Sequence, residues 1–187
     1  MAGQFVFGYG SLVNRRSHGA PRAHPARLDG WRREWCQTNI RPVPFLSARP
    51  APGQRITGLI AEVDGGDWAA LDAREYAYDR HEADTHGHGL DPAPRVQVYA
   101  VAAKHRAADG RGPILMSYLD VVVQGYLHEF GKDGVAEFFA TTDGWDRPVL
   151  NDRPAPRYSR HQRLSPEEQA IVDGHLGALA VAVEELE

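Results

Sequence analysis

The chain has 187 residues, of which 42% are hydrophobic, enough for one domain with an apolar core. Its 21 basic and 25 acidic residues give a net charge of −4, which argues against binding to the phosphate backbone of nucleic acids. No apolar run approaches the roughly 20 residues of a membrane span, and the single cysteine cannot form an internal disulfide, so we expect a cytoplasmic protein without a membrane partner.

The first half of the chain has the pattern of a sheet. Strand-like segments are predicted at about residues 4–8, 27–36, 55–63 and 95–102, with a proline- and glycine-rich loop over 42–53 and a polar loop over 81–94. One helix interrupts them. It begins after Asp67, a good N-cap residue, and is predicted to continue through Glu75.

The second half has helical periodicity. Apolar residues recur at helical spacing over 114–130, Gly131 is a stop signal, and a shorter helix is predicted near 135–140. Ser165 and Glu168 form a capping box around Pro166, and the helix that follows is predicted to run through Val183. Strands followed by helices, with one helix inserted early, predict a single α+β domain over residues 1–187.

The first strand ends in a glycine-rich turn. Gly8 and Gly10 accept positive φ and leave backbone N–H groups uncovered, which suits an anion or a developing oxyanion. The dinucleotide fingerprint is excluded because Val13 stands at the third glycine position and no helix follows. Ser11 lacks the glycines of a nucleophile elbow. A plain strand-to-loop turn remains the alternative.

Glu75 is a carboxylate on the apolar face of the first helix. Trp68 and Leu71 define that face, and Glu75 falls on it at helical spacing. Desolvation there would raise its pKa from about 4.3 towards the range useful for proton transfer. The alternative is that Glu75 ends the helix and pairs with Arg74 or Arg80 at the surface.

Three motifs together resemble the γ-glutamylcyclotransferase superfamily, which includes ChaC-type and AIG2-like members. They are residues 6–12, residues 71–75 with Tyr78 just after, and Tyr118-Leu119 followed by Val122 and Gly125. The resemblance implies a compact mixed β-barrel, about residues 4–103, flanked by helices over about 113–187. It also implies an enzyme with no cofactor and no metal.

The resemblance further implies a function and a site. The enzyme would cyclise the γ-glutamyl group of a small peptide or amide, with glutathione one candidate, to 5-oxoproline and release the attached amine. Glu75 would be the general base. The substrate-binding residues would be Phe7, Gly8, Tyr9, Gly10, Ser11, Leu12 and Tyr118. Tyr118 also fits a core aromatic in the helical stripe. The rival function is a non-catalytic small-ligand-binding or regulatory module on the same barrel.

Other chemistry-bearing residues favour simpler interpretations. The histidines in the polar loop, His81, His86 and His88, are typical of a solvated loop, and we expect no metal there. Cys36 beside a tryptophan fits a core residue better than a nucleophile. The segment 151–158 is expected to wrap across the domain, where it could form one wall of a pocket. No feature of the sequence indicates an oligomeric state.

Overall fold

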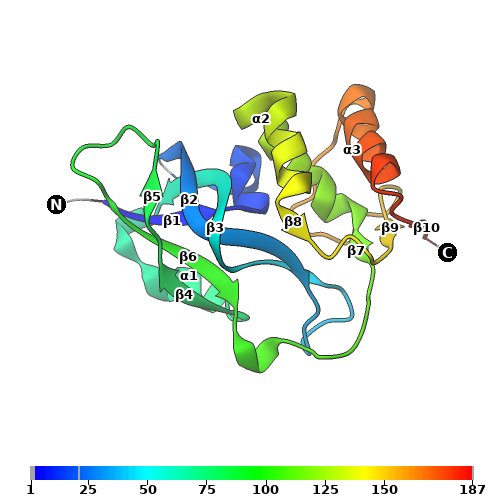
Figure 1. The fold of residues 1–187 in the computed structure, drawn as a ribbon, viewed down its shortest axis with the longest axis horizontal. Helices are drawn as coiled ribbons and strands as arrows, with labels where there is room; N and C mark the ends of the chain where they lie inside the picture. Colours follow the sequence, from blue (N-terminus) through cyan, green and yellow to red (C-terminus); the bar gives the residue numbers. More distant parts are fainter. Residues whose placement is uncertain (1–2, 21, 187) are drawn as a thin grey trace.

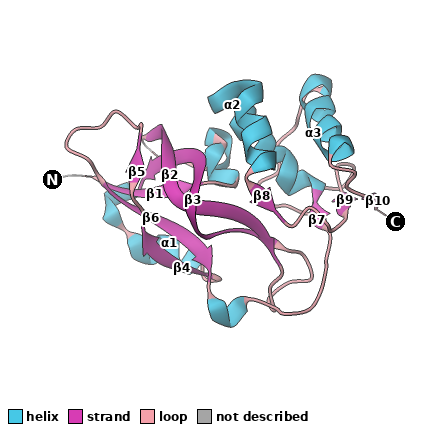
Figure 2. Ribbon diagram, in the orientation of Figure 1, coloured by secondary structure: helices cyan, strands magenta, loops and turns pink. Residues whose placement is uncertain are grey.

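A curled, half-barrel sheet holds the first half of the chain, and two helices lie along one end of it (Figures 1 and 2). This computed structural model describes residues 3–20 and 22–186. The sheet order is β4-β6-β1-β3-β2-β5, and β8 also pairs with β2. The predicted α+β class is therefore confirmed.

The first strand lies in the middle of the sheet. β1 (Gln4–Gly8) pairs antiparallel with β3 (Phe45–Glu62) and parallel with β6 (Arg95–Val101). β3 also pairs along its length with β2 (Ala23–Cys36). The edges are formed by β4 (Tyr78–Glu82), β5 (Thr85–His86) and β8 (Thr142–Asp143). This central position buries residues 5–8, so the glycine turn starts from a rigid strand.

Two predicted loops are partly strand. The loop expected over 42–53 is wrong from Phe45 onward, because β3 begins there. Pro52 is tolerated because it lies where the ladder with β2 is interrupted, between the pairs Trp31–Pro50 and Asp29–Arg55, so its missing N–H costs no pairing there. The loop expected over 81–94 likewise contains the end of β4 and all of β5.

The helices begin close to where the sequence predicts, and the last of them ends earlier than predicted. α1 (Trp68–Arg74) is capped by Asp67, whose side chain accepts from the amide of Ala70 at 3.1 Å. α2 (Met116–Ala140) joins the two helices predicted there, with Gly131 as a non-helical break at φ 68°. α3 (Pro166–Ala178) begins with the predicted capping box.

The prediction that the last helix continues through Val183 is wrong. α3 ends at Ala178, the chain turns through Ala180 at φ 52°, and β10 (Val183–Glu185) follows. β10 pairs parallel with β9 (Val149–Asn151), which also pairs with β7 (Ile114–Leu115). The three-residue parallel pairing with β9, a strand distant in the sequence, takes the place of the last helical turn.

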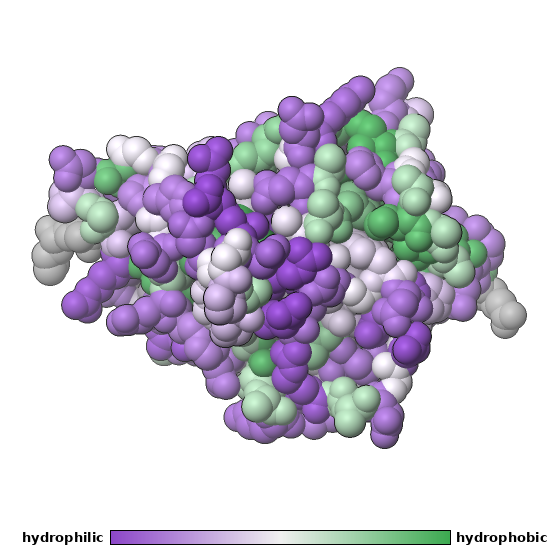
Figure 3. All heavy atoms as spheres, viewed as in Figure 1, coloured by the Kyte–Doolittle hydropathy of each residue, from purple (hydrophilic) through white to green (hydrophobic). Residues whose placement is uncertain are grey.

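The core lies between the sheet and α2. Most of α2 from Met116 to Tyr126 is buried on every side, more than the single stripe that the sequence predicts, because the segment before α3 covers its other face. A Cβ on Gly125 would lie 2.6 Å from the amide nitrogen of Asn14, so α2 touches the backbone just after the glycine turn. The visible surface is mostly hydrophilic (Figure 3), and no helix within residues 3–20 and 22–186 is long and apolar enough to cross a membrane.

Candidate active site

The glycine turn (residues 8–12) connects β1 to a short 3-10 helix, η1 (Ser11–Val13). Neither glycine uses the positive φ that glycine accepts: Gly10 has φ −123°, and Gly8 is not among the positive-φ glycines. The close approach of neighbouring atoms explains why glycine occupies both positions. A Cβ on Gly10 would lie 2.7 Å from the Tyr118 hydroxyl, and one on Gly8 would lie 2.5 Å from the Cβ of Leu12.

The backbone of this turn presents hydrogen-bond donors. The first bond of η1 runs from the amide of Val13 to the carbonyl of Gly10 at 2.9 Å, so the amides before Val13 have no helical partner. Within residues 3–20 and 22–186, no acceptor pairs with the amides of Gly10 and Leu12. The Ser11 backbone interacts with the phenol of Tyr118. The turn therefore keeps N–H groups available to a ligand.

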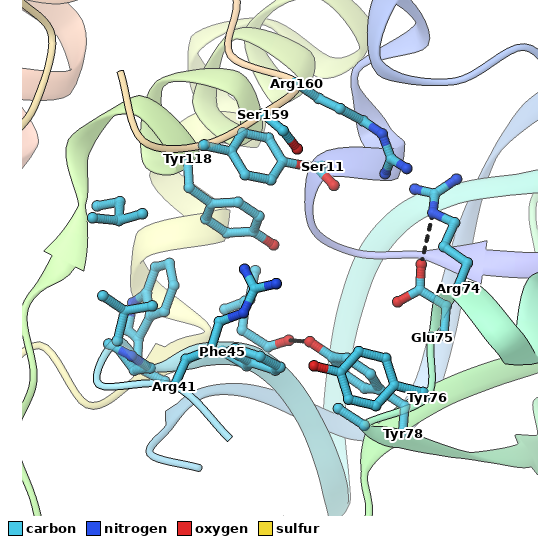
Figure 4. Close-up of a pocket in the computed structure, with 17 residues that line it drawn as sticks. Ser11, Arg41, Phe45, Arg74, Glu75, Tyr76, Tyr78, Tyr118, Ser159 and Arg160 are labelled. Atoms are coloured by element: carbon cyan, nitrogen blue, oxygen red, sulfur yellow. Dashed lines mark hydrogen bonds and ion pairs between the residues drawn. The ribbon is translucent and has the colours of Figure 1, made fainter. Parts of the chain in front are cut away.

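Glu75 is the C-cap residue of α1, and its own amide donates to the carbonyl of Leu71 at 2.9 Å. Its side chain is 22% exposed and points into a pocket (Figure 4). Desolvation raises the pKa of the Glu75 carboxyl, and the nearby charges of Arg74 and Arg160 act in the opposite direction. The carboxylate is thus more easily protonated than an ordinary glutamate.

Both interpretations of Glu75 hold in part. The residue does end the helix, and its Oε1 lies 3.1 Å from Nε of Arg74, an ion pair drawn in Figure 4. Arg80 pairs instead with Asp72 at 2.8 Å. The Glu75 carboxylate nevertheless lines a pocket and does not lie on the open surface.

Two adjoining cavities form the site. The inner pocket, of about 60 Å³, is lined by residues 6–12 together with Leu46, Glu75, Tyr78, Tyr99 and Tyr118. The outer pocket, of about 320 Å³, shares Ser11, Leu46, Glu75, Tyr78 and Tyr118 with it. The inner pocket therefore brings together every residue that the sequence singled out for the site, from Phe7 to Leu12 with Glu75 and Tyr118. Their roles stay predictions.

Two further tyrosines, Tyr78 and Tyr99, complete the inner wall with Tyr9 and Tyr118. The Tyr9 hydroxyl donates to the carbonyl of Tyr99 at 2.6 Å, and the Tyr78 hydroxyl donates to the carbonyl of Leu46 at 3.1 Å. Burial raises the pKa values of Tyr9, Tyr78 and Tyr118 well above 10, so all three stay neutral and keep their protons. Tyr99 could have been found from the alternation of β6, since it faces opposite to Val98.

A segment distant in sequence forms the outer wall. The strap (residues 152–165) connects β9 to α3 and places Tyr158, Ser159 and Arg160 at the outer pocket. Tyr158 packs edge-on against Tyr118, with ring centroids 4.9 Å apart. This agrees with the expectation that residues 151–158 wrap across the domain. No local sequence pattern identifies Arg41, on the facing wall, as a pocket residue.

The remaining candidates lie apart from this site. Within the described residues, no cluster of three or more histidine, cysteine or acidic side chains could hold a metal. His86 pairs with Asp29 at 3.4 Å, and His88 accepts from the amide of Leu90 at 3.1 Å. Cys36 is buried, and desolvation raises the pKa of its thiol, which disfavours the nucleophilic thiolate.

Comparisons with solved structures show the same fold at low identity. The human uncharacterized protein loc79017 matches with a TM-score of 0.56 at 14% identity, over 90% of this chain and 97% of that one. A structure named gamma-glutamyl cyclotransferase matches with a TM-score of 0.55 at 14% identity, over 91% and 98%. YkqA from Bacillus subtilis gives 0.56 at 15% identity, over 76% of this chain and 56% of its own.

The sequence itself identifies the family. No curated protein matches the chain. The family model described as gamma-glutamyl cyclotransferase, AIG2-like, matches residues 6–135, a range that includes β1, the glycine turn, Glu75 and Tyr118. The chain therefore belongs to the gamma-glutamyl cyclotransferase, AIG2-like family.

Proposed function

We propose that this protein is an enzyme that cyclises the γ-glutamyl group of a small peptide or amide to 5-oxoproline and releases the attached amine. The observation that carries the proposal is the placement of the partly desolvated Glu75 carboxylate in one pocket with the unpaired amides of the glycine turn. A base and a set of fixed N–H donors are what this reaction needs.

The substrate supplies its own nucleophile. The α-amine of a γ-glutamyl group reaches the side-chain carbonyl through a five-membered ring, so the attack is intramolecular and gains a high effective molarity. Near neutral pH that amine is an ammonium and cannot attack until it loses a proton. Removing this proton is the task that a cofactor-free enzyme has to perform.

Glu75 would perform the proton transfers. The carboxylate accepts one proton from the ammonium, and the neutral amine then forms the ring C–N bond. As the bond to the leaving nitrogen breaks, Glu75 returns its proton to that nitrogen, and the second proton of the ring nitrogen follows. Both protons lost by the α-nitrogen end on the departing amine, which leaves as an ammonium. A positioned base of this kind contributes about 10²–10⁴-fold.

The glycine turn would stabilise the tetrahedral oxygen. The amides of Gly10 and Leu12 are unpaired and fixed by η1, so they need little reorganisation when negative charge develops on the carbonyl oxygen. One lost donor of this kind costs roughly 3–4 kcal/mol in comparable sites. The neutral Tyr118 hydroxyl, beside Ser11, would orient the substrate.

The rival function is a binding or regulatory module on the same fold. An ion pair between Glu75 and Arg80 would favour it, because the carboxylate would then be neutralised away from the turn. Arg80 pairs with Asp72, and Glu75 faces the turn with Arg74 beside it. These contacts support the enzyme over the module.

The test is release of 5-oxoproline from glutathione and a panel of γ-glutamyl amino acids and amines. The parent protein should turn over at least one of them. Glu75→Gln keeps the shape of the side chain and should lower kcat by about 10²-fold or more. Turnover by this variant within tenfold of the parent would remove Glu75 from the mechanism.

A matched control separates the site from a general loss of charge. Glu82 is exposed at the end of β4 and does not line either pocket. Glu82→Gln should retain the parent's activity, and both variants should keep the parent's circular dichroism spectrum. A complete absence of 5-oxoproline from every substrate, with the parent folded, would favour the binding module.

A further inference from the structure

The charge of the outer pocket is opposite to that of the whole chain. Its ionisable lining residues include three arginines, Arg41, Arg74 and Arg160, and one acid, Glu75, a local balance of 3 − 1 = +2. The chain as a whole has a net charge of −4. A positive cavity in an acidic protein selects for an anionic ligand.

Two of these arginines have no acidic partner. Arg74 is paired with Glu75, whereas neither Arg41 nor Arg160 makes an ion pair within residues 3–20 and 22–186. They come from different walls: Arg41 precedes β3, and Arg160 belongs to the strap (Figure 4). Neither guanidinium is held in an ion pair, so both can bind a ligand from two sides, while the charge of Arg160 also acts on the Glu75 carboxylate.

The two cavities divide the substrate. The glycine turn and Glu75 line the inner pocket, and Arg41 and Arg160 line only the outer one. The γ-glutamyl carbonyl must reach the base and the turn, so the amine that leaves must extend outward past the arginines. On the proposed function, we infer that the leaving amine carries a carboxylate, which Arg41 and Arg160 bind. The substrates are then γ-glutamyl amino acids or peptides, and not γ-glutamyl derivatives of neutral or cationic amines.

The chemistry of the side chains supports this assignment. A guanidinium presents parallel N–H donors that match the two oxygens of a carboxylate, and such charge-assisted bonds are stronger than neutral ones. An ammonium at the same place would meet two unpaired positive charges. Both arginines are exposed at the pocket rim, so solvent and salt weaken the effect, and we expect about tenfold discrimination from the two contacts together.

The experiment compares three substrates that share the γ-glutamyl group and differ in the leaving amine. These are γ-glutamyl-alanine, its uncharged isostere γ-glutamyl-alaninamide, and γ-glutamyl-putrescine, which carries a cation. The kcat/KM for 5-oxoproline release should fall in that order, with about tenfold between the first two. The ratio between the first two should shrink as sodium chloride is raised.

Substitutions at Arg41 and Arg160 test whether these residues bind the carboxylate. Arg41→Gln and Arg160→Gln should each reduce the ratio of kcat/KM between the acid and its amide, and the double variant should bring it close to one. Lysine at either position should restore part of the ratio, because the charge returns without the bidentate geometry. Arg157→Gln is the matched control, since Arg157 is exposed in the same strap and lines neither pocket. It should leave the ratio unchanged.

The ratio of kcat/KM between the acid and its amide distinguishes two possible roles of the arginines. If they held the α-carboxylate of the γ-glutamyl group itself, each substitution would lower kcat/KM for all three substrates equally and leave the ratio unaltered. That result would overturn the inference, as would equal use of the acid and the amide by the parent.

Measurements of binding test this inference independently of the proposed catalytic function. Affinities of the three compounds are measured by calorimetry on Glu75→Gln, which should bind without turnover. A preference for γ-glutamyl-alanine that Arg41→Gln removes in this background supports the charge selection, even if the parent releases no 5-oxoproline and the catalytic proposal fails. Equal affinities, or binding of none of the three, would overturn it.

Discussion

Asp152 holds the strap against α2 through Ser117. The amide of Ser117 donates to one carboxylate oxygen of Asp152 at 2.7 Å, and the Ser117 hydroxyl donates to the other at 2.6 Å. The same carboxylate accepts from the amide of Arg157 at 2.8 Å, and the Ser117 hydroxyl accepts from the amide of Tyr158 at 3.2 Å. A fully buried acid thus fixes the segment that forms the outer wall of the pocket.

Asp152→Ala is expected to loosen that wall. Removing the carboxylate leaves two buried donors of Ser117 and the part-buried amide of Arg157 without their acceptor, at a cost of about 2–4 kcal/mol in the free energy of unfolding. Because Tyr158 and Arg160 follow the tether, KM should rise more than kcat falls. Urea unfolding and steady-state kinetics measure the two effects.

The control for this variant is Asp146→Ala. Asp146 is exposed and pairs with Arg111 at the surface, so its removal should change stability by about 0.5 kcal/mol or less and leave KM unaltered. If Asp152→Ala unfolded at the same urea concentration as the parent and kept the parent's KM, the hydrogen bonds of Asp152 would have no role in shaping the pocket.

Many elements of the fold could be predicted from local sequence, and the long strands β2 and β3 only in part. β1, β6, α1 and the start of α3 follow from short apolar runs, alternation and capping residues. β3 was missed over 45–54 because prolines and a glycine there read as a loop, whereas pairing with β2 holds the segment extended. The end of α3 was missed because the partner of Val183 is Val149, distant in the sequence.

The site divides in the same way. Glu75 and the glycine turn carry motifs that a sequence displays, and the structure brings them to one pocket. Arg41 and the strap residues Tyr158 and Arg160 reach the pocket only through the fold, so no local pattern could identify them. The reason for Gly10 was also hidden, because its neighbour Tyr118 comes from α2.

The pH dependence of catalysis follows from the environment of Glu75. A base acts only when it is deprotonated, so kcat/KM should fall on the acid side with an apparent pKa above that of an ordinary glutamate, since desolvation raises the pKa of this carboxyl. Arg74 acts to lower that pKa, so Arg74→Gln should move the acid limb to higher pH. A limb that stayed in place would show that the ion pair does not tune the base.

The same raised pKa predicts a stability difference between the parent and Glu75→Gln. The folded state binds the Glu75 proton more tightly than the unfolded state, so this group stabilises the fold below its unfolded pKa, and that contribution is lost as pH rises through the folded pKa. Glutamine does not titrate. The variant should therefore gain stability relative to the parent as pH rises above about 4.5, the ordinary value for a glutamate, and through the raised folded-state pKa.

Thermal unfolding at several pH values measures this difference. The Tm of Glu75→Gln minus that of the parent should increase with pH. A difference that decreased with pH would mean that the ion pair with Arg74 outweighs desolvation, and the carboxylate would then be a poor base.

Gly10→Ala tests the close approach between the turn and α2. The new Cβ would lie 2.7 Å from the Tyr118 hydroxyl and 3.2 Å from Cδ2 of Leu46, so the phenol must move. We expect a loss of about 1–3 kcal/mol in stability, typical of overpacking, and lower activity because the turn and Tyr118 both shift. Adding Tyr118→Phe removes the clashing oxygen and should restore most of the lost Tm without restoring activity. If the double variant melted as low as the single one, the contact with Tyr118 would not be the reason that glycine occupies this position.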